Sequence, residues 1–190
     1  MDAETASARS LDAAEKLFYG NGIHAVGMAD VRDAAGVSLK RLYQLFPSKE
    51  TLVTASLARR DVRWRGRLAA HVAAVADPDE RLLAVFDWLH EWFAEPGFRG
   101  CAWVNSFGEL GAVSPAVADE ARRHKAAVRE YLRELVAAAG RPPALADHLF
   151  LLAEGATTVA AISGSAAAAQ QARSAAAALL AADRRPAKKR

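Results

Sequence analysis

The side chains best suited to chemistry lie in residues 38–49, and they are hydrogen-bond donors rather than catalytic groups. Arg41 can donate two hydrogen bonds to guanine, and Gln44 can address adenine or a phosphate. Tyr43 and Lys49 suit phosphate oxygens, which carry no sequence information but fix a protein on a duplex. This set predicts recognition of a nucleic acid in its major groove.

The element that must position these donors spans residues 28–46 and reads as helix, Gly-centred turn, helix. The first helix ends at Gly36, and the second begins after Ser38 as N-cap and is closed by Pro47. Leu42, Leu45 and Phe46 would pack the second helix back on the first. The residues that this packing leaves wholly or partly outward are Leu39, Lys40, Arg41, Tyr43 and Gln44.

Nearly the whole chain reads as helix, without the alternation of β-branched residues that is typical of strands. We expect helices over about 7–19, 28–35, 38–46, 48–75, 103–110, 115–139, 144–163 and 166–180. A further helix is opened by Asp77-Pro78-Asp79 and ended by Pro96-Gly97. Gly and Pro residues separate most of these segments. The predicted fold class is all-α.

Composition limits the class of protein. The chain has 190 residues, of which 52% are hydrophobic, and this excludes an intrinsically disordered chain. A single cysteine, Cys101, excludes a disulfide framework and a Cys-based zinc site. We see no signal peptide, and polar residues and Ser163-Gly164-Ser165 interrupt the charge-free stretch 155–172. We therefore expect a soluble cytoplasmic protein that does not enter the membrane.

The charges are unevenly distributed. Residues 1–67 hold 11 Lys and Arg against 8 Asp and Glu, residues 68–182 hold 9 against 13, and residues 183–190 hold 5 against 1. A basic amino-terminal module on an acidic body indicates a polyanion bound at one end. A solvated helix face explains the same charges, and composition alone does not decide between the two.

These motifs resemble the DNA-binding domain of the TetR (tetracycline-repressor-like) family. The resemblance covers about residues 7–53 and rests on Leu11-Asp12-Ala13-Ala14-Glu15-Lys16-Leu17-Phe18, Gly22, Ala34-Ala35-Gly36-Val37-Ser38, Leu42-Tyr43 and Phe46-Pro47-Ser48-Lys49-Glu50-Thr51-Leu52. It implies a homodimeric, all-helical transcription regulator, usually a repressor, that a small ligand releases from DNA. By the same resemblance, Lys40 and Arg41 fall at variable base-reading positions, and Tyr43 and Lys49 at phosphate-contacting positions.

The chain departs from the family pattern at three places. Gly27 stands where a Thr commonly caps the second helix, and Leu45 replaces a position that is commonly His or aromatic. Lys40-Arg41 replaces the common Gly-Thr, which predicts tighter DNA binding with a steeper salt dependence. The full set of expected DNA-binding residues is Met28, Ser38, Leu39, Lys40, Arg41, Tyr43, Gln44 and Lys49.

We expect three parts in the chain. Residues 1–47 form the helix-turn-helix DNA-binding domain, residues 48–182 a larger helical ligand-binding and dimerisation domain, and residues 183–190 a disordered basic tail. Within the larger domain, 48–75 is a connecting helix and 144–182 holds the dimer helices. Residues 144–163 are apolar on most of their circumference, which favours a four-helix dimer interface over an intramolecular core.

Beyond residue 67, the expected ligand-binding part of the chain carries no motif as specific as the helix-turn-helix. The expected contacts to an apolar or aromatic ligand are Trp88, Trp92, Trp103, Asn105, Phe107, Glu109 and His124. For each aromatic residue taken singly, ordinary core packing is favoured over ligand contact, and a satisfied core or interface histidine is favoured for His124. Glu154 and His148 are candidates for pairing across the dimer helix. The arginines from Arg59 to Arg67 read as a solvated helix surface with ion pairs to the acidic body.

Two other functions remain open. An enzyme is disfavoured because the chain lacks a Gly-rich phosphate loop, a nucleophile elbow and a His-Glu-x-x-His pattern, and its five histidines have no metal-ligand spacing. We therefore expect no cofactor and no metal. The second alternative is a DNA-binding dimer without an inducer, which a tightly filled ligand cavity would favour. The operator, the regulated gene, the effector and the sign of regulation are not readable from the sequence.

Overall fold

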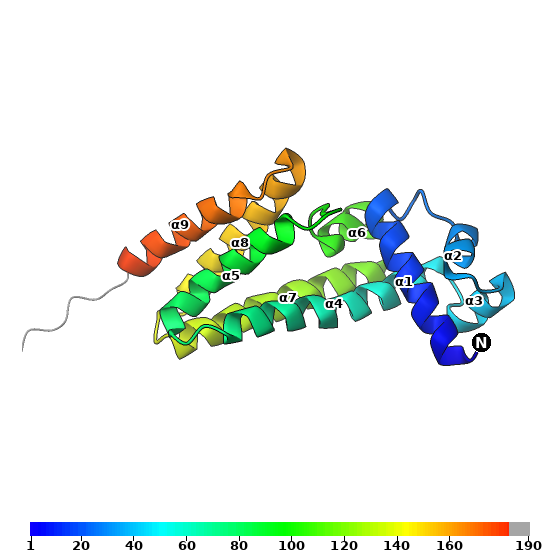
Figure 1. Cartoon of the computed structure of the whole chain (residues 1–190), viewed down its shortest axis with the longest axis horizontal. Helices are drawn as coiled ribbons and strands as arrows, with labels where there is room; N and C mark the ends of the chain where they lie inside the picture. The colour runs from blue at the N-terminus through cyan, green and yellow to red at the C-terminus, as the bar shows by residue number, and fades with distance from the viewer. Residues whose placement is uncertain (183–190) are drawn as a thin grey trace, which may run out of the picture. The chain divides into compact units, whose positions relative to one another are not determined.

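The structure, a computed structural model, describes residues 1–182, and this part of the chain contains nine helices and no strand. The helices are α1 (Ala3–Asn21), α2 (Met28–Ala35), α3 (Leu39–Leu45), α4 (Lys49–Ala73), α5 (Pro78–Phe93), α6 (Ala102–Leu110), α7 (Pro115–Ala138), α8 (Ala144–Ser163) and α9 (Ala167–Ala182) (Figure 1). The all-α prediction is confirmed. The expected disordered tail, residues 183–190, lies outside the described residues.

Local capping explains where several helices begin. The Ser38 hydroxyl accepts the Arg41 N–H at 3.1 Å, and the Ser48 hydroxyl accepts the Thr51 N–H at 3.1 Å. The N-cap at Ser38 was predicted from the sequence and is confirmed. Helix α1 begins four residues earlier than the predicted Ser7, at Ala3, because Asp2 accepts the Thr5 N–H at 2.7 Å.

The described chain divides into two compact units. The first unit comprises Met1–Trp64 and Cys101–His124, and the second comprises Arg65–Gly100 and the described residues from Lys125 onward. The division passes within α4 and within α7. The first unit is therefore larger than the predicted DNA-binding domain 1–47, because α6 and the start of α7 pack with the amino-terminal helices.

The first unit has its core where α1, α2 and α3 meet. Val31 of α2 and Leu42 of α3 are fully buried, as is Ala14 of α1. Phe18 and Phe46 close the same core. Each of these side chains belongs to the apolar face that helical periodicity predicts for its helix.

The second unit has a core in which α5 and α8 pack on α9, as Figure 1 shows. Phe86, Leu149 and Ala176 are fully buried there. Arg141, just after α7, donates to both Asp79 oxygens at 2.8 and 2.5 Å. A bidentate pair of this kind, largely shielded from water on the arginine side, fixes the start of α5 against the end of α7.

Helix α8 is the most apolar helix of the described part. By length and composition alone it could cross a membrane, and 39% of its most apolar window is buried within the described protein; a single helix of this kind is weak evidence for a membrane span. Glu154 of α8 forms an ion pair of 2.5 Å with Lys125 of α7. The carboxylate predicted to pair across a dimer interface therefore has a partner within its own chain.

Candidate nucleic-acid interface

The turn between α2 and α3 requires glycine at position 36. Gly36 adopts a left-handed conformation with φ of 63°, and its N–H donates to the Asp33 carbonyl at 3.3 Å. A Cβ at this position would lie 2.6 Å from the Arg9 guanidinium. The left-handed backbone conformation therefore favours glycine at this turn.

Helix α3 presents its polar face to solvent. Leu42 and Phe46 are buried against the first unit, whereas Lys40 and Gln44 are exposed and the Tyr43 side chain is 45% exposed. Arg41 is half-buried, and its guanidinium lies 3.4 Å from the Gln44 carbonyl oxygen. The outward orientation predicted for this face is confirmed, while its contact with DNA stays a prediction.

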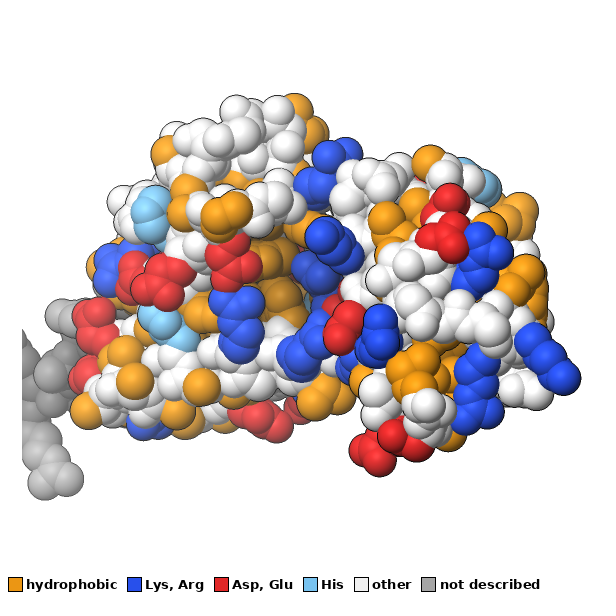
Figure 2. Space-filling view, turned by 45° about the vertical axis from the view of Figure 1, so that its right-hand side comes forward, with side chains coloured by type: hydrophobic (Ala, Val, Ile, Leu, Met, Phe, Trp, Pro, Cys, Tyr) orange, Lys and Arg blue, Asp and Glu red, His pale blue; other side chains and the backbone are white. Residues whose placement is uncertain are grey.

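The cations of α3 differ from the neighbouring Arg32 in their pairing. Arg32 donates to both oxygens of Asp33 at 2.8 and 2.7 Å, and this hydrogen bonding holds the pKa of Asp33 below its usual value. Within residues 1–182, no carboxylate forms an ion pair with Lys40, Arg41 or Lys49. Figure 2 shows Lys and Arg side chains on the surface at the end of the chain that holds α2 and α3. The positive charge of Lys40, Arg41 and Lys49 is therefore available to an external anion.

Of the three remaining predicted residues, Leu39 is exposed at the start of α3, whereas Ser38 and Met28 stabilise the fold. Ser38 caps α3, and Met28 is buried at the first position of α2. Gly27 lacks a side-chain cap, but its own N–H donates to the Asp30 carboxylate at 2.7 Å. One half of a capping box thus persists without the Thr that is common in the family, which accounts for the start of α2 at its predicted residue.

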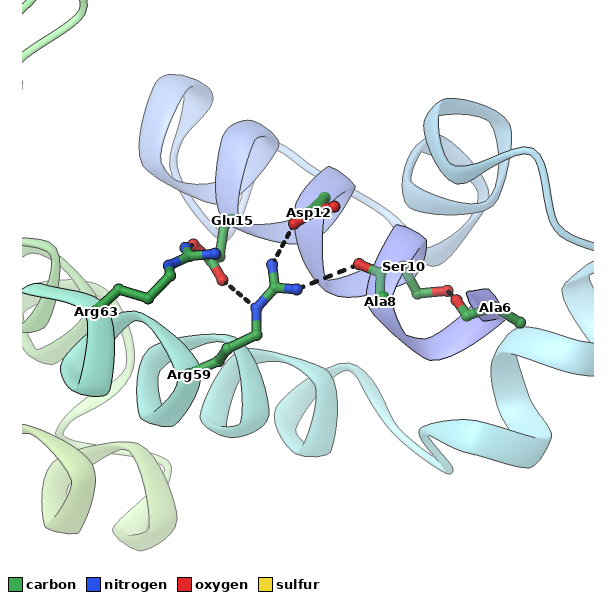
Figure 3. Close-up of polar contacts among 7 residues, drawn as sticks. All are labelled: Ala6, Ala8, Ser10, Asp12, Glu15, Arg59 and Arg63. Atoms are coloured by element: carbon green, nitrogen blue, oxygen red, sulfur yellow. Dashed lines mark hydrogen bonds and ion pairs between the residues drawn. The ribbon is translucent and has the colours of Figure 1, made fainter. Parts of the chain in front are cut away.

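The arginines of α4 hold α1 in place (Figure 3). Arg59 donates to Glu15 and to Asp12, each at 2.7 Å, and Arg63 pairs with the same Glu15. Arg67 pairs with Glu95 in the second unit. The predicted ion pairs are therefore present, but those of Arg59 and Arg63 go to α1 rather than to the acidic body.

The seven expected ligand contacts are divided between the two units. In the second unit, Trp88 and Trp92 stack with ring centroids 5.6 Å apart, and Phe98 meets Trp92 edge-on at 5.1 Å. Trp88 and Trp92, both on α5, are buried, and Phe98 of the following loop is half-buried against them.

The other five lie in the first unit. His124 is buried and stacks on Trp103 with centroids 3.5 Å apart, while its Nδ1 lies 2.6 Å from the Asp61 carboxylate. The histidine on an apolar helix face is thus paired, as a satisfied core histidine must be. Phe107 is nearly half exposed. Ligand contact by any of these residues stays a prediction.

Asn105 and Glu109 line a cavity of about 30 Å³ between α1, α4 and α6. Its wall also includes Phe18, Ile23, Val53 and Arg60. The Arg60 guanidinium lies 4.3 Å from the centre of the Tyr19 ring, at the same wall. The space suits a few water-sized groups.

Two residues at this end of the chain were missed by sequence reasoning. Arg9 packs against the Gly36 turn, and His24 contacts Glu109 through both its backbone and its ring. Each contact joins residues that are distant in the sequence, so no local spacing indicates it. Among the described residues no group of three His, Cys, Asp or Glu side chains is placed to hold a metal ion.

A helix, a left-handed glycine turn and a second helix with an unpaired cationic face together define a helix-turn-helix regulatory protein. The family described as bacterial regulatory proteins, tetR family, matches residues 11–55. Two proteins of Mycobacterium tuberculosis strains, described as uncharacterized HTH-type transcriptional regulators, are 41% identical over 80 residues. Those residues make up 42% of this chain and only 40% of each relative.

Similarity to solved structures extends over nearly the whole chain. A TetR-family regulator from Streptomyces coelicolor superposes with a TM-score of 0.87 at 27% identity, covering 96% of this chain and 97% of that one. A TetR-type regulator from Streptomyces avermitilis gives 0.82 at 29%, covering 94% and 97%. A regulator from Saccharomonospora viridis, solved with choline, gives 0.74 at 19%, covering 94% and 96%, and so shares the fold. Residues 11–55 thus match the tetR family of bacterial regulatory proteins, and the whole chain has the fold of TetR-family regulators, which are not enzymes.

Proposed function

We propose that this protein is a homodimeric, cytoplasmic DNA-binding regulator that represses transcription from a palindromic operator and is released by a small apolar or aromatic ligand. The observation that carries the proposal is the face of α3. Lys40 and Arg41 project from it without carboxylate partners, while Leu42 behind them is buried. A helix held in this way can enter the major groove with its charged and amide groups facing base edges.

Within this proposal, Arg41 and Gln44 read bases, and Tyr43 and Lys49 hold phosphates. Lys49 begins α4, so its side chain stands beside the unsatisfied N–H groups of a helix amino terminus. An amino terminus and a lysine attract the same phosphate group. Residues 1–47 would thus serve as the reading domain, and residues 48–182 as the ligand-binding and dimerisation domain.

The dimer is supported by the exposed face of α8. Leu151, Gly155, Thr158 and Ile162 recur every three or four residues and are all exposed. Leu151 is 67% exposed and Ile162 is 82% exposed, which is costly for side chains of this size. The small Gly155 lets another helix approach closely. A second copy of the same face would cover these groups and make an isologous interface.

Release by a ligand would act by changing the distance between the two α3 helices of the dimer. A two-fold dimer presents its α3 helices about 34 Å apart, one turn of DNA. A ligand that binds one spacing more tightly than another shifts the population toward it. Proteins of this fold can hold a small molecule, as the choline complex of the S. viridis regulator illustrates.

The test is selection of bound fragments from genomic DNA by the purified protein, followed by titration of the recovered sites. We expect a two-fold symmetric site bound in the nanomolar range or tighter at moderate salt. Arg41→Ala protein serves as the matched control and should recover a degenerate site. Recovery of random fragments by the wild-type protein would contradict the proposal.

A second candidate function is a DNA-binding dimer without an inducer. The packing of Trp88, Trp92 and Phe98 favours it, because aromatic side chains stacked on one another leave no room for a ligand among them. Melting of the protein against a panel of aromatic and apolar compounds separates the two candidates. A regulator with an inducer gains stability from at least one compound class.

A further inference from the structure

The segment between α1 and α2 is held from α6 by three hydrogen bonds. Glu109 accepts the Ile23 N–H on Oε1 at 3.0 Å and the His24 N–H on Oε2 at 2.8 Å. The Glu109 carbonyl oxygen also lies 3.1 Å from Nε2 of the His24 ring. One residue of α6 therefore binds the segment through both its carboxylate and its backbone.

The segment is shaped to bind an anion. Gly22 has φ of 87°, a conformation that side chains rarely adopt, and two successive N–H groups follow it. Both N–H groups reach the same carboxylate, one to each oxygen. Successive amides that converge in this way form a concave anion site. Hydrogen bonds to an ionised acceptor are about twice as strong as neutral ones.

A small solute can reach this site. Glu109 and Ile23 both line the cavity between α1, α4 and α6. At about 30 Å³ the cavity admits water-sized groups, and removal of the Glu109 side chain would add space for a small carboxylate. The carboxylate of Glu109 therefore acts as an internal ligand of the Ile23 and His24 N–H groups. Once this side chain is removed, an external carboxylate can occupy the same site.

We propose that Glu109 is a positioning residue, an internal anionic ligand that fixes the segment preceding α2 and thereby the seating of α2 and α3 on α1. The inference rests on the proposed DNA-binding function. Because Met28 begins α2 shortly after His24, freeing the segment loosens the reading helices without removing any DNA contact. Operator affinity then depends on a residue of α6 that lies outside the helix-turn-helix.

The first test needs no DNA. In the free protein, Glu109→Ala should speed amide hydrogen exchange at Ile23 and His24 by about 10- to 100-fold, as expected for loss of two charge-assisted hydrogen bonds. Glu134→Ala is the control, because Glu134 is an exposed carboxylate of α7. Unchanged exchange at Ile23 and His24 would overturn the proposal.

The second test is chemical rescue of operator binding. In potassium chloride, Glu109→Ala should bind the selected operator about 10-fold more weakly than the wild type. In potassium acetate of equal ionic strength, acetate occupies the vacated site and restores affinity to within about 3-fold. Wild-type and Glu134→Ala proteins should respond alike to the two salts. Loss of affinity that acetate does not restore would contradict a positioning role.

Glu109→Gln keeps the experiment decisive should the alanine variant fail to fold. Its amide fills the space but serves only one of the two N–H groups, so affinity falls and acetate has no effect. Full affinity in this variant would overturn the proposal. If the wild-type protein binds no duplex while exchange at Ile23 and His24 still depends on Glu109, the DNA-binding function fails and the anion site stands.

Discussion

Helices α3 and α8 leave opposite kinds of surface uncovered. Helix α3 buries Leu42 and exposes cationic and amide groups, whereas α8 buries Leu149 and exposes Leu151 and Ile162. Water solvates the α3 face well and the α8 face poorly. Under the proposed function the two faces would bind partners of different chemistry, a polyanion at α3 and a second copy of the chain at α8.

The largest effect is expected on the exposed apolar face of α8. Ile162→Glu places a charge where a dimer would bury an apolar side chain, and we expect a dissociation constant at least about 30-fold weaker. Sedimentation velocity over a concentration series measures this shift. The matched control is Val62→Glu on α4, since Val62 is also exposed, at 69%. A dimer insensitive to Ile162→Glu would place the interface elsewhere.

At α3, substitutions distinguish residues that contact bases from residues that contact phosphates. Arg41→Ala should cost about 1–3 kcal/mol of operator affinity and relax preference at one base position. Lys49→Ala and Tyr43→Phe should weaken all sequences alike, and Lys49→Ala should also reduce the salt slope by about 0.9 per lost phosphate contact. Titrations across operator variants at several salt concentrations measure both quantities. Equal losses at every base would make Arg41 a phosphate contact.

The support beneath the reading helices depends on burial as well as charge. Arg59 pairs with Glu15, whose side chain is 8% exposed, and with Asp12, which is 68% exposed. We expect Glu15→Gln to lower the free energy of unfolding by about 1–3 kcal/mol, because it leaves two arginines without a shielded partner. Asp12→Asn should cost below about 0.5 kcal/mol. Urea unfolding of the two variants tests this order, and equal losses would contradict it.

The smallest expected effect lies at the start of α1. The Thr5 N–H bonded to Asp2 holds the pKa of that carboxyl below its ordinary value of 3.8. The cap therefore stabilises α1 above pH 3.8 and loses its effect as the pH falls through the lower folded value. The protection factor of the Thr5 amide, which is its exchange relative to that of an unfolded chain at the same pH, should fall with acid in the wild type. In Asp2→Ala protein this protection should already be low at neutral pH, and protection that persists in Asp2→Ala would contradict the cap.

Much of the fold was predictable because helix formation is local. Ser38 and Ser48 cap helices through contacts three residues away, and Gly36 interrupts the apolar period between α2 and α3. The outward face of α3 followed from the same period. Helix α1 was predicted too short, because its cap at Asp2 precedes the apolar pattern that marked the helix.

The expected ligand residues were less predictable. Trp92 and Trp103 lie in different compact units although they are close in sequence, since Gly100 ends one unit and Cys101 begins another. Aromatic composition identifies residues that will be buried but not which of them will meet. His124 illustrates this, because its stripe position predicted a partner and only the structure names Asp61.

The sequence by itself determined the all-helical architecture, the helix-turn-helix and the cationic face of α3, because each depends on neighbours within one or two helical turns. Only the tertiary structure decided which distant groups meet. Glu109 reaches the segment before α2 across more than eighty residues, and Arg59 reaches Glu15 across more than forty. Such contacts leave no periodic trace in a sequence, because chain folding, rather than spacing, brings their partners together.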